Sequence, residues 1–117
     1  EQTLAFMDLG QVNPGHTLVA VKRHATDLLD LTADEAAAAM RTAHRVAQAV
    51  KKAFDPPGLT LRQGNGQAGD QTVFHFHIHV VPRHVDDGVG LSWPRKDPAR
   101  DQLEAYAAQL RQALAAG

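Results

Sequence analysis

The sequence predicts a single α+β domain, a fold class supported by the chain length and by two kinds of apolar pattern. The chain has 117 residues and a mass of 12.6 kDa, which is the size of one ordinary domain. Two segments repeat apolar residues at helical spacing, and four shorter runs are rich in apolar and β-branched residues. No repeat or linker separates them, so we expect one core shared by residues 1–117.

The first predicted helix begins after Thr32. Thr32 and Glu35 have the spacing of a capping box, in which each side chain bonds the backbone of the other residue. Apolar residues then recur at steps of three and four and form one stripe, made of Met40, Ala43, Ala47, Val50 and Phe54. Pro56-Pro57-Gly58 ends the helix.

A second helix is predicted in the last quarter of the chain. Asp97 fits an N-cap, and Pro98 fits the first helical position, where its missing N–H costs nothing. The helix has an apolar stripe that we expect to be buried, formed by Leu103, Tyr106, Leu110 and Leu114. This helix and the first would then share one core.

Four runs are predicted to be strands, at residues 3–7, 17–21, 59–63 and 73–81. The last is the longest and reads Val-Phe-His-Phe-His-Ile-His-Val-Val. Because side chains alternate faces along a strand, its apolar residues would point into the core. Its three histidines would form a row on the other face, spaced by about 6.6 Å, and they are His75, His77 and His79.

The composition excludes several classes of protein. Twelve Lys+Arg against thirteen Asp+Glu give a formal net charge of −1, which argues against binding nucleic acid by bulk charge. A hydrophobic share of 44% excludes intrinsic disorder, and no apolar run approaches the length of a membrane span. There is no cysteine, although seven residues are histidine. We therefore expect a cytoplasmic protein with no nucleic-acid or membrane partner.

The histidine row has three interpretations. Three polar residues could simply face solvent, although threonine, lysine or glutamate would serve a wet face equally well. The row could bind a metal such as zinc, for which His-x-His is a suitable pair. It could also perform nucleophilic catalysis at phosphorus, with one imidazole attacking and its neighbours binding the phosphate. The glycine-rich loop at residues 64–70 favours the last interpretation, because its backbone N–H groups can approach an anion closely.

At this point the sequence resembles the histidine triad (HIT) family. Its motif, His-φ-His-φ-His-φ-φ with φ apolar, matches residues 75–81 at every position. The match extends to Asn65, Gly69, Gln71, Thr72 and Pro82-Arg83, and to a second block at residues 5–9, 13–19 and 22–24. The chain is most similar to small bacterial nucleotide phosphoramidases. The resemblance implies a HIT-like fold, with a five-stranded antiparallel sheet and two helices, paired as a homodimer.

The resemblance also implies an enzyme and its catalytic residues. His77 would attack the α-phosphorus of a purine nucleotide phosphoramidate, ester or anhydride, forming a covalent nucleotidyl-histidine and releasing AMP or GMP on hydrolysis. His79 would hydrogen-bond the phosphate, and His75 and His24 would support the geometry. His16 is expected to make structural hydrogen bonds only. Two other classes stay open: a metal-binding module using the histidine row, and a nucleotide-binding partner protein with vestigial catalysis.

The nucleotide-binding residues are likewise implied by the resemblance. Asn65 would hold the ribose side or the loop, while Gln71 and Thr72 would contact the phosphate and the leaving group. Asp8 would accept hydrogen bonds from the ribose hydroxyls, and Phe6 and Leu9 would line the purine slot. Trp93 would plug the core beneath residues 88–94 or, as the family suggests, lie near the partner's active site.

No cofactor is expected. Many bacterial members of the family bind structural zinc through an N-terminal Cys-x-x-Cys, helped by histidines at the positions of His24 and His75. This chain contains no cysteine and begins at Glu1. Either that segment precedes Glu1 or the metal is lacking, and we predict no zinc within these residues.

Overall fold

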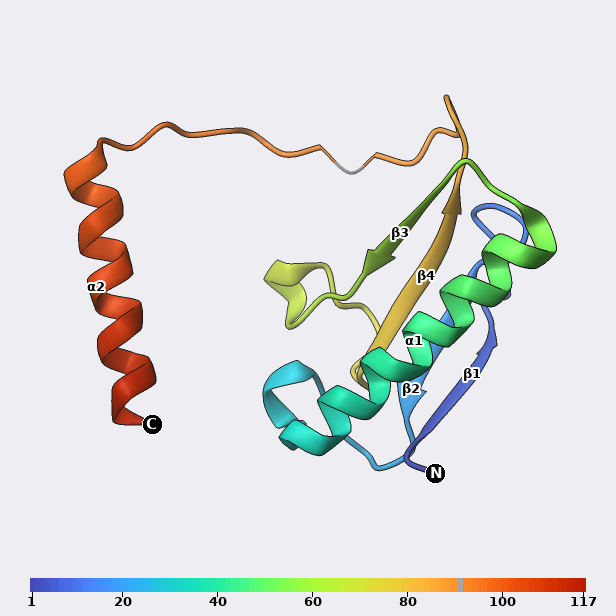
Figure 1. Ribbon diagram of the computed structural model, residues 1–117, viewed down its shortest axis with the longest axis horizontal. Helices are drawn as coiled ribbons and strands as arrows, with labels where there is room; N and C mark the ends of the chain where they lie inside the picture. Colours follow the sequence, from blue (N-terminus) through green and yellow to red (C-terminus); the bar gives the residue numbers. More distant parts are fainter. Residues whose placement is uncertain (91) are drawn as a thin grey trace.

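The computed structural model describes residues 1–90 and 92–117, and within them the chain forms one four-stranded antiparallel sheet covered on one face by a long helix (Figure 1). The strands are ordered β1-β2-β4-β3. Two short 3-10 turns, η1 and η2, lie in the connections. The elements are β1 (Thr3–Met7), β2 (Thr17–Val21), η1 (Leu28–Asp30), α1 (Ala33–Phe54), β3 (Gly58–Arg62), η2 (Gln67–Gly69), β4 (His77–Arg83) and α2 (Arg100–Ala116).

The α+β class and the two helices are confirmed, but the expected five-stranded sheet is wrong for the described residues, which form four strands. The sequence itself shows only four runs with strand character. Between β4 and α2 the described residues, 84–90 and 92–99, form an extended arm without a further strand (Figure 1). None of the described helices is both long and apolar enough to cross a membrane.

The capping box predicted for α1 is present. The Thr32 hydroxyl accepts a hydrogen bond from the Glu35 backbone N–H at 3.1 Å, and the Glu35 carboxylate accepts one from the Thr32 N–H at 2.9 Å. Arg23, just after β2, donates to the same carboxylate through Nε at 2.7 Å and Nη2 at 2.9 Å. The first turn of α1 is thereby bonded to the chain that leaves β2.

The core lies between α1 and one face of the sheet. Its buried residues come from β2, the loop after β2, the inner side of α1, β4 and the residue just before β4, and they include Val19, Val21, Ala25, Ala39, Ala43, Val50, Phe76, Ile78 and Val80. The predicted stripe of α1 is buried only in part, since Met40 and Phe54 stay about half exposed. Neither of the described helices, α1 or α2, lies over the opposite face of the sheet (Figure 1).

The last strand is shorter than predicted. It begins at His77 rather than at residue 73. Ahead of it the chain turns inward, because the Phe76 N–H donates to the Ala25 carbonyl at 2.8 Å and the Phe76 ring is buried. Phe74, expected in the core, is half exposed. Strand alternation therefore places only His77 and His79 on the open face, and His75 lies outside the strand.

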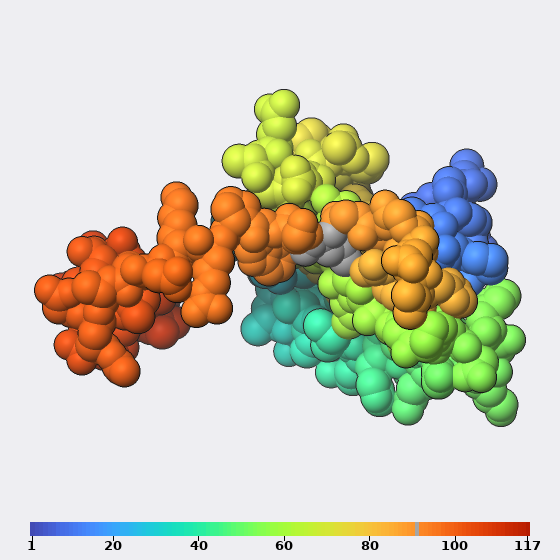
Figure 2. Space-filling view, turned by 90° about the horizontal axis from the view of Figure 1, so that it is seen from above, coloured from blue at the N-terminus to red at the C-terminus, as the bar shows by residue number. Residues whose placement is uncertain are grey.

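The second helix differs from its prediction at its start and in its packing. It begins at Arg100 with Ala99 as N-cap, so Asp97 and Pro98 belong to the extended arm. No residue of α2 is buried; its apolar stripe is about half exposed or more, reaching 81% at Leu114. Trp93, for which a place in the core was one of two expectations, is 83% exposed, so the core position is wrong. Figures 1 and 2 show the cause, because the arm holds α2 away from the sheet and α1.

The dimensions of the chain agree with this separation. Its radius of gyration is 16.8 Å, whereas a compact domain of this length has about 13 Å. The apolar stripe of α2 therefore lacks a partner within the described part of its own chain, and burying it requires another molecule.

The ion pair between Arg23 and Glu35 at the start of α1 is expected to make the stability of the fold decrease at acidic pH. The hydrogen bonds from Arg23 and then from the Thr32 N–H lower the pKa of Glu35 to about 2. A carboxylate with a lowered pKa stabilises the fold above its ordinary value of 4.5, and this stabilisation is lost as the pH falls towards 2. We expect Glu35→Gln to lower Tm at pH 7 and the difference from the parent to disappear between these pH values. Asp34→Asn, at an exposed neighbour in the same turn, removes only an interaction with the helix dipole and should lower Tm less than Glu35→Gln. An equal loss in both variants would contradict the assignment.

Candidate active site

The open face of the sheet carries the functional side chains. Residues paired across antiparallel strands share a face, so the register defines two rows. One row consists of Phe6, Leu18, His79 and Arg62, and the other of Leu4, Ala20 and His77. Both rows pass from apolar residues on β1 and β2 to imidazoles on β4. The face thus offers an apolar region beside a polar one.

His77 is held in a defined tautomer. Its Nδ1 lies 2.7 Å from the backbone carbonyl of His75. A carbonyl only accepts, so Nδ1 carries the proton, and in the neutral ring the lone pair is on Nε2. His77 lines a cleft of about 530 Å³ together with Thr72 and the glycine loop. A nucleophilic nitrogen is therefore available beside a loop rich in backbone N–H groups.

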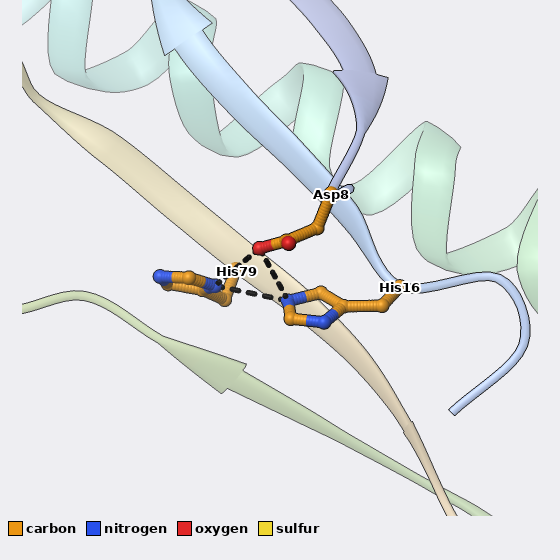
Figure 3. A group of neighbouring side chains, drawn as sticks. All are labelled: Asp8, His16 and His79. Atoms are coloured by element: carbon orange, nitrogen blue, oxygen red, sulfur yellow. Dashed lines mark hydrogen bonds and ion pairs between the residues drawn. The ribbon is translucent and has the colours of Figure 1, made fainter. Parts of the chain in front are cut away.

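His79 is part of a second hydrogen-bonded group, with His16 and Asp8 (Figure 3). His16 Nε2 lies 3.0 Å from His79 Nδ1 and 3.5 Å from Asp8 Oδ2. His16 Nδ1 accepts from the Val12 N–H at 3.3 Å, so in neutral His16 the proton is on Nε2 and is donated to His79 Nδ1. Neutral His79 then carries its own proton on Nε2, which points away from His16 (Figure 3).

This group shows what the sequence interpretation missed. His16, expected to have only a structural role, is buried and sets the tautomer of a predicted catalytic residue. Asp8, expected at the ribose, lies beside both imidazoles, with its Oδ1 accepting from the Gly10 N–H at 2.7 Å. The signal available in the sequence was the position of His16, directly after Pro14-Gly15 at the start of a strand.

His75 and His24 lie together, apart from the other imidazoles. His75 Nε2 donates to the Val21 carbonyl at 2.7 Å, and the rings of His24 and His75 have centroids 5.7 Å apart. The three histidines of the motif therefore do not form the single row expected from strand alternation. His75 still supports His77, through the carbonyl that accepts from its Nδ1.

Two of the predicted nucleotide-binding residues, Gln71 and Asn65, make hydrogen bonds that hold the glycine loop in place. Buried Gln71 accepts from the Gly66 N–H at 2.7 Å and donates to the carbonyls of Thr26 and Val73 at 2.6 and 3.2 Å. Asn65 accepts from the Leu28 N–H at 2.8 Å. These bonds position the loop, and Thr72 is left exposed at the cleft.

The loop also depends on one close backbone approach. A Cβ placed on Gly64 would lie 2.3 Å from the Gly69 carbonyl oxygen. No side chain fits at that distance, so the two ends of the loop can meet only because residue 64 is glycine.

The apolar region of the face forms a cleft of about 310 Å³. Phe6, Leu18, Ala20 and Val73 line it, and it reaches His75 and His77. Phe6 thus lies where an apolar ring could be bound next to His77. Leu9 is fully exposed and is not among the residues that line this cleft.

The residues that could hold a metal ion differ from the histidine row considered in the sequence analysis. Among residues 1–90 and 92–117, one group of His, Asp and Glu side chains has ligand atoms close enough together to hold a metal ion. It consists of Asp8, His16 and His79. Their atoms are 3.0, 3.5 and 4.0 Å apart. Tetrahedral zinc with bonds of 2.0–2.1 Å separates its ligands by about 3.3 Å. The row of His75, His77 and His79 does not converge in this way, because His75 faces Val21.

Comparison with known proteins identifies the family. A family model described as HIT domain matches residues 1–86. The chain belongs to the histidine triad (HIT) family. "Protein hit" of Bacillus subtilis is 38% identical over 94 residues, which are 80% of this chain and 65% of that protein. Adenosine 5'-monophosphoramidase of Schizosaccharomyces pombe is 30% identical over 109 residues, covering 92% of this chain and 79% of that enzyme.

The HIT fold is shown equally by solved structures. A HIT family protein from Bacillus anthracis matches with a TM-score of 0.92 at 36% identity, covering 97% of this chain and 82% of that one. This chain spans just under two thirds of the length of the Bacillus subtilis relative.

The environment of His79 predicts an acid titration. Burial, followed by the positive charges of His77 and His16, lowers the pKa of His79 to about 4. The ring should therefore stay neutral down to about pH 5, and its Cε1–Hε1 NMR signal should titrate with a midpoint near 4. Since protonation favours the unfolded chain, in which the ring has its ordinary value of 6.5, the contribution of His79 to stability falls as the pH drops from 6.5 towards 4. A midpoint above 6 would contradict this environment.

Proposed function

We propose that this chain is a nucleotide hydrolase or transferase that acts at the α-phosphorus through His77. The observation that carries the proposal is the hydrogen bond from His77 Nδ1 to the His75 carbonyl, which leaves the Nε2 lone pair free beside the loop. The substrates would be purine nucleotide phosphoramidates, esters or anhydrides. Membership of the HIT family and similarity to a phosphoramidase support this choice.

The reaction proceeds in two displacements. The Nε2 lone pair attacks phosphorus, and the bond to the leaving group breaks as the N–P bond forms. The leaving group departs with the bonding electrons, and an amine must gain a proton as it leaves. Water then attacks the phosphorus of the nucleotidyl-histidine and loses a proton to the solvent as the N–P bond breaks, which yields AMP or GMP. His77 returns to its neutral form.

The other residues bind and orient the nucleotide. Nε2–H of His79 donates to a phosphate oxygen, because its Nδ1 already accepts from His16. The Thr72 hydroxyl lies at the same cleft and can bond the phosphate or the leaving group. The base would occupy the apolar cleft beside Phe6, and Asp8 would accept from the ribose hydroxyls. Burial of His79 keeps its ring uncharged, so it can act as a neutral donor at physiological pH.

Replacing the nucleophile gives the direct test. His77→Ala should reduce AMP release from adenosine phosphoramidate by at least about a hundredfold, because no other imidazole has a free nitrogen in the same place. His44→Ala, at an exposed position of α1, is the matched control and should retain activity. Intact mass spectrometry of the parent during turnover should detect an AMP adduct that is missing in His77→Ala. Activity should survive EDTA. Turnover by His77→Ala within tenfold of the parent would overturn the proposal.

We further propose that the protein is a homodimer in which the apolar stripe of α2 is buried against the partner. A stripe of four large side chains, all about half exposed or more, on a helix held away from its own sheet supports this. Light scattering after gel filtration should give twice 12.6 kDa for this chain. Leu110→Glu should shift it towards the monomer, while Gln112→Glu, with the same added charge on the opposite side of α2, should not. A monomeric parent, or an equal shift in both variants, would contradict the proposal.

A further inference from the structure

Arg62 is a cation at the active site to which the proposed reaction has given no role. It is the last residue of β3 and pairs with His79 across the sheet, so the two side chains share the open face. It lines the cleft of His77 and also the cleft of Asp8 and His16. Among the described residues that line the His77 cleft, Arg62 alone has a permanent positive charge.

The order of residues across the sheet places Arg62 at one end of a bound nucleotide. The row runs from Phe6 and Leu18 through His79 to Arg62. With the base over the apolar residues and the α-phosphate at the imidazoles, the leaving group points towards β3. Neighbouring strands are about 4.8 Å apart, so Arg62 is one step beyond the α-phosphate. A second phosphate attached to the first would lie within reach of its guanidinium.

The present partner of Arg62 holds it only weakly. Its Nη2 lies 3.5 Å from Asp70 Oδ2, and both side chains are largely exposed. Ion pairs of this kind contribute little to stability, so a phosphate can displace the carboxylate at small cost. Asp70 is the C-cap of η2, with a φ of 67°, and it is one of the residues that line the His77 cleft. The ion pair with Asp70 therefore keeps the Arg62 guanidinium at the cleft, and a phosphate can still displace the carboxylate.

The charge of Arg62 also reaches the reacting centre. It contributes, after burial and the charges of His77 and His16, to the lowered pKa of His79. A positive charge that acts on His79 acts equally on negative charge developing on a leaving phosphate next to it.

We propose that Arg62 forms a subsite for an anionic leaving group, so that the enzyme favours nucleotide anhydrides, in which a second phosphate follows the α-phosphate, over phosphoramidates. This inference rests on the proposed nucleotidyl transfer at His77. As the Nε2–P bond forms, the P–O anhydride bond breaks, and the leaving phosphate takes the electron pair and pairs with the guanidinium. No proton is needed at that step. An amine leaving group needs one, and a guanidinium, which stays protonated in proteins, cannot supply it.

The test compares two substrates that share the adenosine and the α-phosphorus. For diadenosine triphosphate, Arg62→Gln should lower kcat/KM by about 10- to 100-fold, the range expected for charged hydrogen bonds. For adenosine phosphoramidate the change should be less than about threefold. Arg62→Lys should restore part of the anhydride activity, since it keeps the charge but loses the planar fork. Arg45→Gln, on an exposed position of α1, is the control and should alter neither substrate.

A binding measurement separates this inference from the proposed function. Calorimetry should show that ADP binds the parent more tightly than AMP and that Arg62→Gln removes the difference. This result would support the subsite even if neither substrate were turned over, which would overturn only the proposed reaction. Equal losses on both substrates in Arg62→Gln, or equal affinities of the parent for ADP and AMP, would overturn the subsite.

Discussion

The active site depends on the antiparallel pairing of β2 with β4 over α1. Val19 and Ile78 are paired on the face buried against the helix, so their neighbours Leu18 and His79 are paired on the open face. Because strand side chains alternate with a period of two, a slip of β4 by one residue would bury both of its histidines and expose Ile78 and Val80. The hydrophobic core therefore specifies which way the imidazoles point.

Backbone groups then decide where the protons on these imidazoles lie. The His75 carbonyl accepts from Nδ1 of His77, and the Val12 N–H donates to Nδ1 of His16. Through the His16–His79 contact at 3.0 Å, the second bond also sets the tautomer of His79. One ring thus presents a lone pair at Nε2 and the other a donor at Nε2. This is the pair of roles that attack on a phosphate ester and binding of its oxygens require.

Local patterns predicted much of the fold. The capping box at Thr32 and Glu35, the end of α1 before Pro56, and the existence of four strands all follow from short-range rules that tertiary packing did not override. The HIT motif likewise located His77 and His79. The start of β4 was misjudged because the alternation of apolar and histidine residues begins at residue 73. The bond from Phe76 to Ala25 ends the strand geometry there, and such a contact has no local signature.

The sequence by itself determined the fold class and the family and pointed to His77 as the proposed nucleophile, because each is expressed in spacing along a few neighbouring residues. Only the tertiary structure brought His16 and Arg62 to His79. His16 lies directly before β2 and Arg62 is the last residue of β3, and both strands pair with β4. It likewise decided that His75 leaves the histidine row and that the stripe of α2 is not covered by its own chain. The physical reason is the same in each case. A helix or strand pattern states which face is apolar, but what lies against that face is decided by distant parts of the chain or by another molecule.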